Sequence, residues 1–248
     1  IAEKNKVNLE FEASVCGGVP IIRSIKEGLI ANKIQKIYGI FNGTSNYILS
    51  SMDKDNQNFL DVLNKAKTLG YAETNPASDL NGDDVAAKLK ILSSLCFNSY
   101  LNNNIHVEGI KNIDKEDIDN ANKLGYKIKL LGYAELINNN IFQRVHPTLI
   151  KTSSYVASID GVLNAVIIDG TPVGQSIIQG EGAGPTATTS ALVSDISSIL
   201  RGNIKFPFSI SNKKRKKLQF KNISERSFSA YLRFEVADRP GVLSKITN

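Results

Sequence analysis

The chain has 248 residues, of which 42% are hydrophobic and 22% are charged, and its formal net charge is +6. This length fits one large domain or two smaller ones, and the composition is that of a globular protein rather than a disordered one. The longest apolar runs, such as residues 165–168, are far shorter than the roughly 20 residues of a transmembrane helix, so we expect neither a membrane span nor a secretory signal.

Most of the excess positive charge lies in one block, residues 213–217. Such a block is compatible with nucleic-acid binding, but aromatic residues are not interleaved with it, so we interpret it as a solvated linker and expect no nucleic-acid partner. The two cysteines, Cys16 and Cys96, belong to no CxxC motif. We predict buried structural thiols in a reducing cytoplasm.

The first half of the chain predicts two strand-to-helix corners. Residues 7–15 alternate between apolar and polar, which is typical of a strand, and the glycines and proline of residues 16–20 break it before a helix over 21–28. A second strand over 36–41 ends at Asn42-Gly43, and the side chains of Thr44, Ser45 and Asn46 can cap a helix that continues to Met52. A further helix over 58–69 is expected to stop at Gly70.

The second half predicts a sheet. Residues 83–95 have a helical apolar stripe, and strands are expected over 127–134, 141–145, 155–159, 165–169 and 176–179. These elements predict an α+β fold, a mixed β-sheet with helices on one face. A glycine-rich corner over 180–184 leads into a helix over 188–200 that Gly202 caps, residues 203–226 read as a linker, and residues 227–236 alternate as a strand.

A charged stretch over residues 66–88 is the strongest functional signal. Asp84 and Lys88 are four residues apart on a predicted helix, so they share a face. They can be a solvent-exposed pair that stabilises the helix, and acidic residues before a helix, such as Asp79, interact well with its N-terminus. Glu73 lies too far upstream for that explanation. A carboxylate cluster can bind a substrate amino group while Lys88 donates a proton.

The pattern Ala66-x3-Gly70-Tyr-Ala-x2-Asn75-Pro76-x2-Asp79-Leu-x-Gly82-x-Asp84-x3-Lys88 resembles the signature of homoserine dehydrogenase. Residues 11–23, 39–49 and 180–184 are similar to other segments of that family, so the resemblance covers about residues 8–202. It implies NADH- or NADPH-dependent reduction of aspartate 4-semialdehyde to homoserine, on the route to threonine and methionine.

The resemblance also implies site residues. Lys88 would be the proton donor, Glu73 and Asp84 would bind the substrate with help from Asp79, and Gly70, Gly182 and Gly184 would contact the NAD or NADP cofactor. A sodium site would be formed by Glu12, Val15, Gly17 and Val19, although a tight turn also explains these glycines. Residues 180–184 lack the GxGxxG spacing of a Rossmann fingerprint. His106 and His146 match no role in the family, and we expect them to be structural.

The resemblance further implies a fragment that lacks the Rossmann domain. We expect residues 1–10 to end that domain, 11–185 to form the catalytic and dimerisation domain of a homodimer, and 186–203 to return towards the nucleotide-binding domain. Residues 204–226 would be a linker, and 227–248 resemble the start of a truncated ACT domain. The alternative is a non-catalytic amino-acid-binding or regulatory protein derived from that fold.

Overall fold

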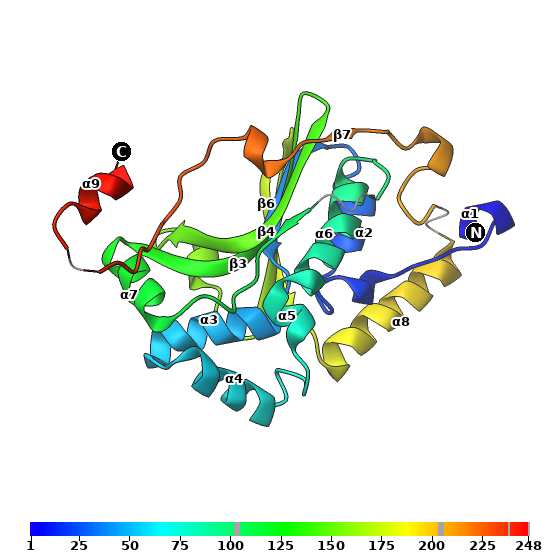
Figure 1. The fold of residues 1–248 in the computed structure, drawn as a ribbon. Coiled ribbons are helices and arrows are strands. Elements are labelled where there is room, and N and C mark those ends of the chain that lie inside the picture. Colours follow the sequence, from blue (N-terminus) through cyan, green and yellow to red (C-terminus); the bar gives the residue numbers. More distant parts are fainter. Residues whose placement is uncertain (102–104, 203–205, 238, 248) are drawn as a thin grey trace.

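A single β-sheet runs through the computed structural model, which describes residues 1–101, 105–202, 206–237 and 239–247 (Figure 1). Its strands are β1 (Lys33–Ile40), β2 (His106–Val107), β3 (Tyr126–Ile137), β4 (Asn140–Lys151), β5 (Leu163–Thr171), β6 (Gly174–Glu181) and β7 (Gln219–Phe220). Their order is β2-β4-β3-β1-β5-β6, and β7 also pairs with β4. The pairs β2–β4 and β4–β7 are parallel and the others are antiparallel. The predicted mixed sheet is confirmed.

Helices lie mainly on one side of this sheet (Figure 1), and among them α3, α6 and α7 pack on its strands. They are α1 (Ala2–Asn5), α2 (Ile21–Arg23), α3 (Gly43–Asp55), α4 (Phe59–Thr68), α5 (Ala77–Asn81), α6 (Asp83–Cys96), α7 (Lys115–Lys123), α8 (Pro185–Arg201) and α9 (Val242–Thr247). The main core lies between the sheet and these helices, where the stripe of α6 is buried as predicted. A smaller core on the opposite face contains Val156 and Ile159, which cover Ile40 and Ile167.

The predicted helices over 21–28, 58–69, 83–95 and 188–200 are confirmed, the first as α2 continued by a π-helical turn over Ser24–Gly28. Gly70 and Gly202 follow the ends of their helices with φ of 76° and 70°, in the left-handed region that glycine tolerates. Strands β3 and β4 are longer than predicted. Asn138 and Asn139 both have positive φ, so they form a tight two-residue hairpin turn between these strands.

Three strand predictions are wrong. Residues 7–15 join no sheet in the described part of the chain, and Glu12–Ser14 form a 3-10 turn in which the Glu12 carboxylate accepts two backbone hydrogen bonds. Residues 155–158 are also a 3-10 helix. Residues 227–236 form no ladder; instead Arg233 pairs with Glu116 and Asp117 of α7. Alternation shows which side chains are buried, but a strand also needs a neighbouring strand.

The linker predicted over 203–226 lies partly outside the described residues, since these omit 203–205. The described part of this segment, residues 206–226, packs against the rest of the chain. The Arg215 guanidinium lies 4.4 Å from the centroid of the Phe208 ring and 5.1 Å from that of Tyr100, and β7 adds to β4. Within the described residues, no helix has the combination of length and apolar character that crossing a bilayer requires.

Candidate active site

The corner between β1 and α3 forms one wall of the candidate site. Asn42 has extended dihedral angles and caps α3, because its Oδ1 accepts a hydrogen bond of 2.8 Å from the Ser45 backbone N–H. The predicted caps, Thr44 to Asn46, are therefore wrong: these residues lie inside the helix. Gly43 allows the close approach of another segment, since a Cβ there would lie 2.7 Å from the Val162 carbonyl oxygen.

The opposite wall is the pair of helices α5 and α6, which meet at Gly82. Gly82 has φ of 88°, which turns the chain between the two helices and places Asp79 of α5 near Asp84 in the first turn of α6. Lys88 lies one turn further along α6. The sequence pattern did not reveal α5, because five residues are too few for a visible periodicity.

Asp79, Asp84 and Lys88 come together in one hydrogen-bonded network. The Lys88 Nζ lies 2.7 Å from Asp84 Oδ2 and 2.9 Å from the Phe41 carbonyl oxygen. The Asn42 Nδ2 lies 2.8 Å from Asp79 Oδ1 and 2.8 Å from Asp84 Oδ2. The Lys88 side chain is 18% exposed, so this pair is more enclosed than the ordinary surface pair that spacing alone would suggest.

Glu73 is not part of this network. Its side chain is exposed, and no hydrogen bond or ion pair of the described residues joins it to Asp79, Asp84 or Lys88. The segment before it is nevertheless fixed on α3: Thr44 Oγ1 donates a 2.6 Å hydrogen bond to the Tyr71 carbonyl, and the rings of Tyr47 and Tyr71 meet edge to face, with centroids 4.9 Å apart. The neighbouring Gly70 is exposed.

Two glycine corners, residues 16–18 and 180–184, pack against each other. A Cβ on Gly17 would lie 2.5 Å from the Gly182 carbonyl oxygen, and the Gly18 N–H donates a 3.0 Å hydrogen bond to the Glu181 carbonyl. Gly184 directly precedes α8 with φ of 109°. Gly17, Gly18 and Gly182 therefore have a packing reason at this contact, which spacing in the sequence could not reveal, whereas Gly184 has open space around it and is explained by its positive φ.

Cys16 connects these corners to the charged network. Burial raises the pKa of its thiol to about 11, with the Lys88 ammonium acting in the opposite direction and Asp84 reinforcing the rise. Both charges therefore lie close enough to Cys16 to influence it. Cys16 and Cys96 are free and buried, as predicted for structural thiols.

Asn164 of β5 completes the contact between the corners. Its side chain is fully buried, and a Cβ on Gly182 would lie only 2.2 Å from its Cγ. Apart from the neighbouring Cys16 thiol, a weak hydrogen-bonding group, its Nδ2 and Oδ1 have no partner among the described residues. Sequence reasoning missed this residue, because a single asparagine in a predicted strand gives no signal.

The four residues expected to hold sodium are only partly available as ligands. Both Glu12 carboxylate oxygens accept backbone hydrogen bonds, Oε1 from Ile22 N–H at 2.7 Å and Oε2 from Arg23 N–H at 2.8 Å. The Val19 carbonyl accepts from the Ile21 N–H at 2.7 Å. Burial raises the pKa of Glu12. This geometry gives Glu12 a structural role, capping α2, that requires no cation.

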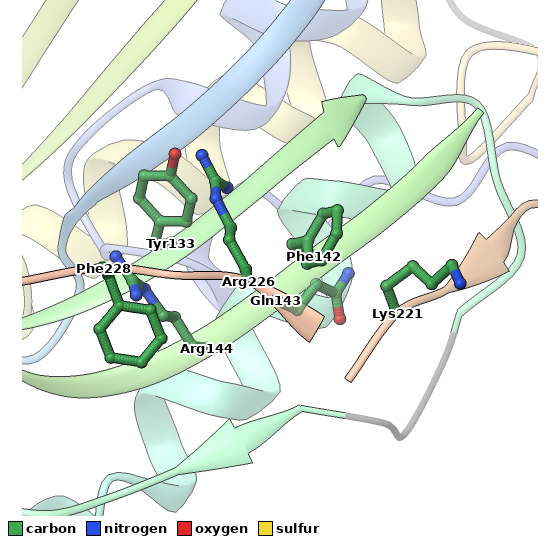
Figure 2. A pocket seen from close by; sticks show the side chains of 7 residues that line it. All are labelled: Tyr133, Phe142, Gln143, Arg144, Lys221, Arg226 and Phe228. Carbon is green, nitrogen blue, oxygen red and sulfur yellow. The ribbon is translucent and has the colours of Figure 1, made fainter. Parts of the chain in front are cut away.

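A second cluster joins β3 and β4 to residues 221–228 (Figure 2). Its pocket is lined by aromatic and basic side chains, among them Tyr133, Phe142, Arg144, Lys221, Arg226 and Phe228. The Arg144 guanidinium lies 5.0 Å from the Tyr133 ring centroid and 5.1 Å from that of Phe228, between the two rings. These contacts hold residues 221–228 against the sheet, so packing is sufficient to explain the cluster.

Neither histidine shows a ligand arrangement. His106 is exposed on β2, and burial lowers the pKa of the half-buried His146 on β4 to about 4, with Arg144 adding to the effect. Within the described residues, no group of three or more histidine, cysteine or acidic side chains is placed to hold a metal ion.

Comparison with known proteins gives consistent matches. Residues 20–197 match the family described as homoserine dehydrogenase. The chain is 43% identical to the homoserine dehydrogenase of Neisseria gonorrhoeae over an alignment of 253 residues, which covers 99% of this chain and 58% of that protein.

Solved structures agree. A homoserine dehydrogenase from Thiobacillus denitrificans is 40% identical and superposes with a TM-score of 0.86, covering 96% of this chain and 56% of that one. A hyperthermophilic archaeal homoserine dehydrogenase mutant in complex with NADPH is 26% identical and has a TM-score of 0.67, covering 79% of this chain and 56% of that one. The chain thus spans somewhat more than half the length of these relatives.

Proposed function

The chain belongs to the homoserine dehydrogenase family, and from this we propose that it carries the catalytic part of an enzyme that interconverts L-homoserine and L-aspartate 4-semialdehyde with NAD or NADP. In this proposal it serves threonine and methionine biosynthesis. The observation that carries the proposal is the network in which Lys88 contacts Asp84 and the Phe41 carbonyl.

The contacts of Lys88 suit a proton donor. An ammonium group has three N–H bonds, and the contacts to Asp84 Oδ2 and the Phe41 carbonyl occupy two of them. The third has no partner among the described residues, so it can donate to a substrate oxygen. The Asp84 carboxylate, at hydrogen-bond distance, compensates the positive charge of Lys88 and orients its ammonium group.

The substrate would bind between the two walls of the site. Asp79 and Asp84 offer carboxylates to its amino group, and Glu73, on the segment anchored to α3, would close over it. In the reductive direction Lys88 transfers a proton to the carbonyl oxygen that becomes the hydroxyl, and in the oxidative direction neutral Lys88 takes this proton back. The nicotinamide cofactor, when bound, supplies or accepts the hydride.

The glycine corner fits a cofactor with an amide group. Gly182 and Gly184 carry no side chain that would block a ligand, and among the described residues the buried Asn164 amide beside Gly182 has no hydrogen-bond partner other than the Cys16 thiol. We propose that Gly70, Gly182 and Gly184 contact the cofactor. The sodium ligands Glu12, Val15, Gly17 and Val19 are kept as a proposal, supported only by their oxygen-rich character.

An apolar stripe on α8 supports contact with a further domain. Leu192, Val193, Ile196, Ile199 and Leu200 are all at least 42% exposed, although they follow helical spacing. We propose that a nucleotide-binding domain covers this stripe in the whole protein. Residues 227–248 would begin an ACT domain, and the two free buried thiols fit the cytoplasm.

We also propose a homodimer. The sheet face opposite the helices is covered only in part, by the 3-10 helix Tyr155–Ser158, and it leaves Tyr155 53% and Ile177 41% exposed. A second copy could bury these side chains. Light scattering of the purified protein tests this proposal, and a monomer at micromolar concentration would contradict it.

The activity is tested on the protein expressed with the segments that its gene encodes around residues 1–248. L-homoserine should support reduction of NAD or NADP, measured by absorbance of the reduced cofactor, and L-serine, which is shorter by one carbon, should not. Asp84→Asn should retain the fold and lose most of the rate. Homoserine binding without turnover with either cofactor would instead support the non-catalytic alternative.

A further inference from the structure

We infer that Asn42 is a positioning residue for this reaction: its one amide group holds Asp79 and Asp84, and through Asp84 also Lys88, in the reactive arrangement. The inference rests on the proposed function, because it takes Asp84 and Lys88 as the groups that meet the substrate. Asn42 itself is 6% exposed and would act through its neighbours.

The orientation of the Asn42 amide is fixed by three partners. Its Oδ1 accepts the Ser45 backbone N–H, and its Nδ2 faces one oxygen of Asp79 and one of Asp84 at 2.8 Å each. Both amide hydrogens are thus used, one for each carboxylate. A flipped amide would place its oxygen against two carboxylates and its nitrogen against an N–H donor, so only one orientation is compatible with all three contacts.

The dipeptide Phe41–Asn42 therefore fixes both ends of the Asp84–Lys88 pair. The Phe41 carbonyl accepts from Lys88 Nζ at 2.9 Å, while Asn42 donates to the same Asp84 oxygen that contacts Lys88. Without the two amide donors, Asp79 and Asp84 would each lose the hydrogen bond from Asn42 that orients its carboxylate. Two carboxylates held this close repel each other unless a shared donor lies between them.

A purely structural role is the competing explanation, because Asn42 also caps α3. In addition, Ser45 Oγ donates a 2.9 Å hydrogen bond to the Asp79 backbone carbonyl, so the first turn of α3 supports α5 directly. Loss of the cap could therefore disturb the site indirectly. A useful variant must keep the cap and remove only the two donors.

Asn42→Ser meets this requirement, since serine caps helices about as well as asparagine but its hydroxyl cannot donate to two carboxylates. We expect the melting temperature to stay within about 3 °C of the parent. The kcat/KM for L-homoserine should fall by about 10–100-fold, as expected for lost hydrogen bonds to charged groups. The KM for the cofactor should not change. Asn58→Ser makes the same substitution at the N-cap of α4, outside the site and at a side chain with no capping hydrogen bond, and should behave like the parent.

A fall of less than about threefold in kcat/KM for L-homoserine would overturn the inference and leave Asn42 as a helix cap. An equal change in the KM for homoserine and in the KM for the cofactor would also overturn the inference. If the parent protein itself does not oxidise homoserine, the proposed function fails, and a crystal structure of Asn42→Ser then decides the inference separately. In that structure the side chains of Asp79 and Asp84 should adopt different rotamers from those of the parent. Unchanged rotamers would refute the positioning role of Asn42.

Discussion

Replacement of Lys88 by methionine removes the ammonium group but keeps a flexible apolar side chain of similar length. The Phe41 carbonyl and Asp84 Oδ2 each lose one donor, while Asn42 still donates to Asp84. Because the Asp84 side chain is 28% exposed and water can reach it, we expect a loss of only about 1 kcal/mol in the free energy of unfolding. This corresponds to a fall of about 2–4 °C in melting temperature.

The effect on turnover should be far larger. Loss of a general acid costs about 10²–10⁴-fold in rate, so kcat for homoserine oxidation should fall by that factor. Lys88→Arg separates charge from proton transfer, because a guanidinium keeps its positive charge but does not release its proton near neutral pH. We expect Lys88→Arg to be nearly as slow as Lys88→Met.

Initial rates with saturating cofactor, together with circular dichroism of each variant, measure both quantities. Lys90→Met, on the same helix but with no ion pair among the described residues, is the matched control and should keep the parent rate. If Lys88→Met retained more than about a tenth of the parent kcat, the role of Lys88 as proton donor would be refuted. If Lys88→Met failed to fold, Lys88 would be a structural residue.

Three further predictions concern other parts of the molecule. Gly182→Ala places a methyl group 2.2 Å from the buried Asn164 Cγ, so the KM for the cofactor should rise by about tenfold or more. Gly28→Ala, in open space, is the control and should leave this KM unchanged. The same KM for both variants would contradict the prediction. His146 stays neutral in the folded protein down to a pKa of about 4, against its ordinary 6.5, so stability should decline as pH falls from 6.5 towards 4, by at most about 3 kcal/mol. Urea unfolding at pH 7 and pH 5 should show a smaller difference for His146→Gln than for the parent, and an unchanged difference would refute the assignment. Ile196→Lys charges the exposed stripe of α8, so it should lower the melting temperature of the whole protein by about 2–4 °C if another domain covers this stripe, and leave it unchanged if water does.

Local sequence patterns were sufficient where one segment contains all the information. The spacing of Val85, Leu89, Leu92 and Cys96 predicted α6, and these side chains are buried in the core. Gly70 and Gly202 predicted helix ends because only glycine adopts positive φ without strain. The failures occurred where burial comes from distant contacts: residues 155–159 alternate like a strand, but residues 155–158 form a 3-10 helix that covers the second face of the sheet.

The candidate site also contains residues that the sequence indicated and partners that only the fold supplies. The motif over residues 66–88 indicated Asp79, Asp84 and Lys88 from their chemistry and from resemblance, and spacing alone placed Asp84 and Lys88 on one face of a helix. The partners of these residues come from elsewhere in the chain: Phe41 and Asn42 connect β1 to α3, and Asn164, which meets the glycine corner, belongs to β5. Glu73 remains outside the network although the motif includes it.

The amino-acid sequence therefore established the family, the mixed sheet and the identity of the charged groups, because these depend on residue types at fixed spacings. The arrangement of those groups depends on contacts across the fold. Hydrogen bonds of 2.8 Å between Asn42 and two aspartates on other helices require a particular packing of β1, α5 and α6, and no local pattern encodes that distance.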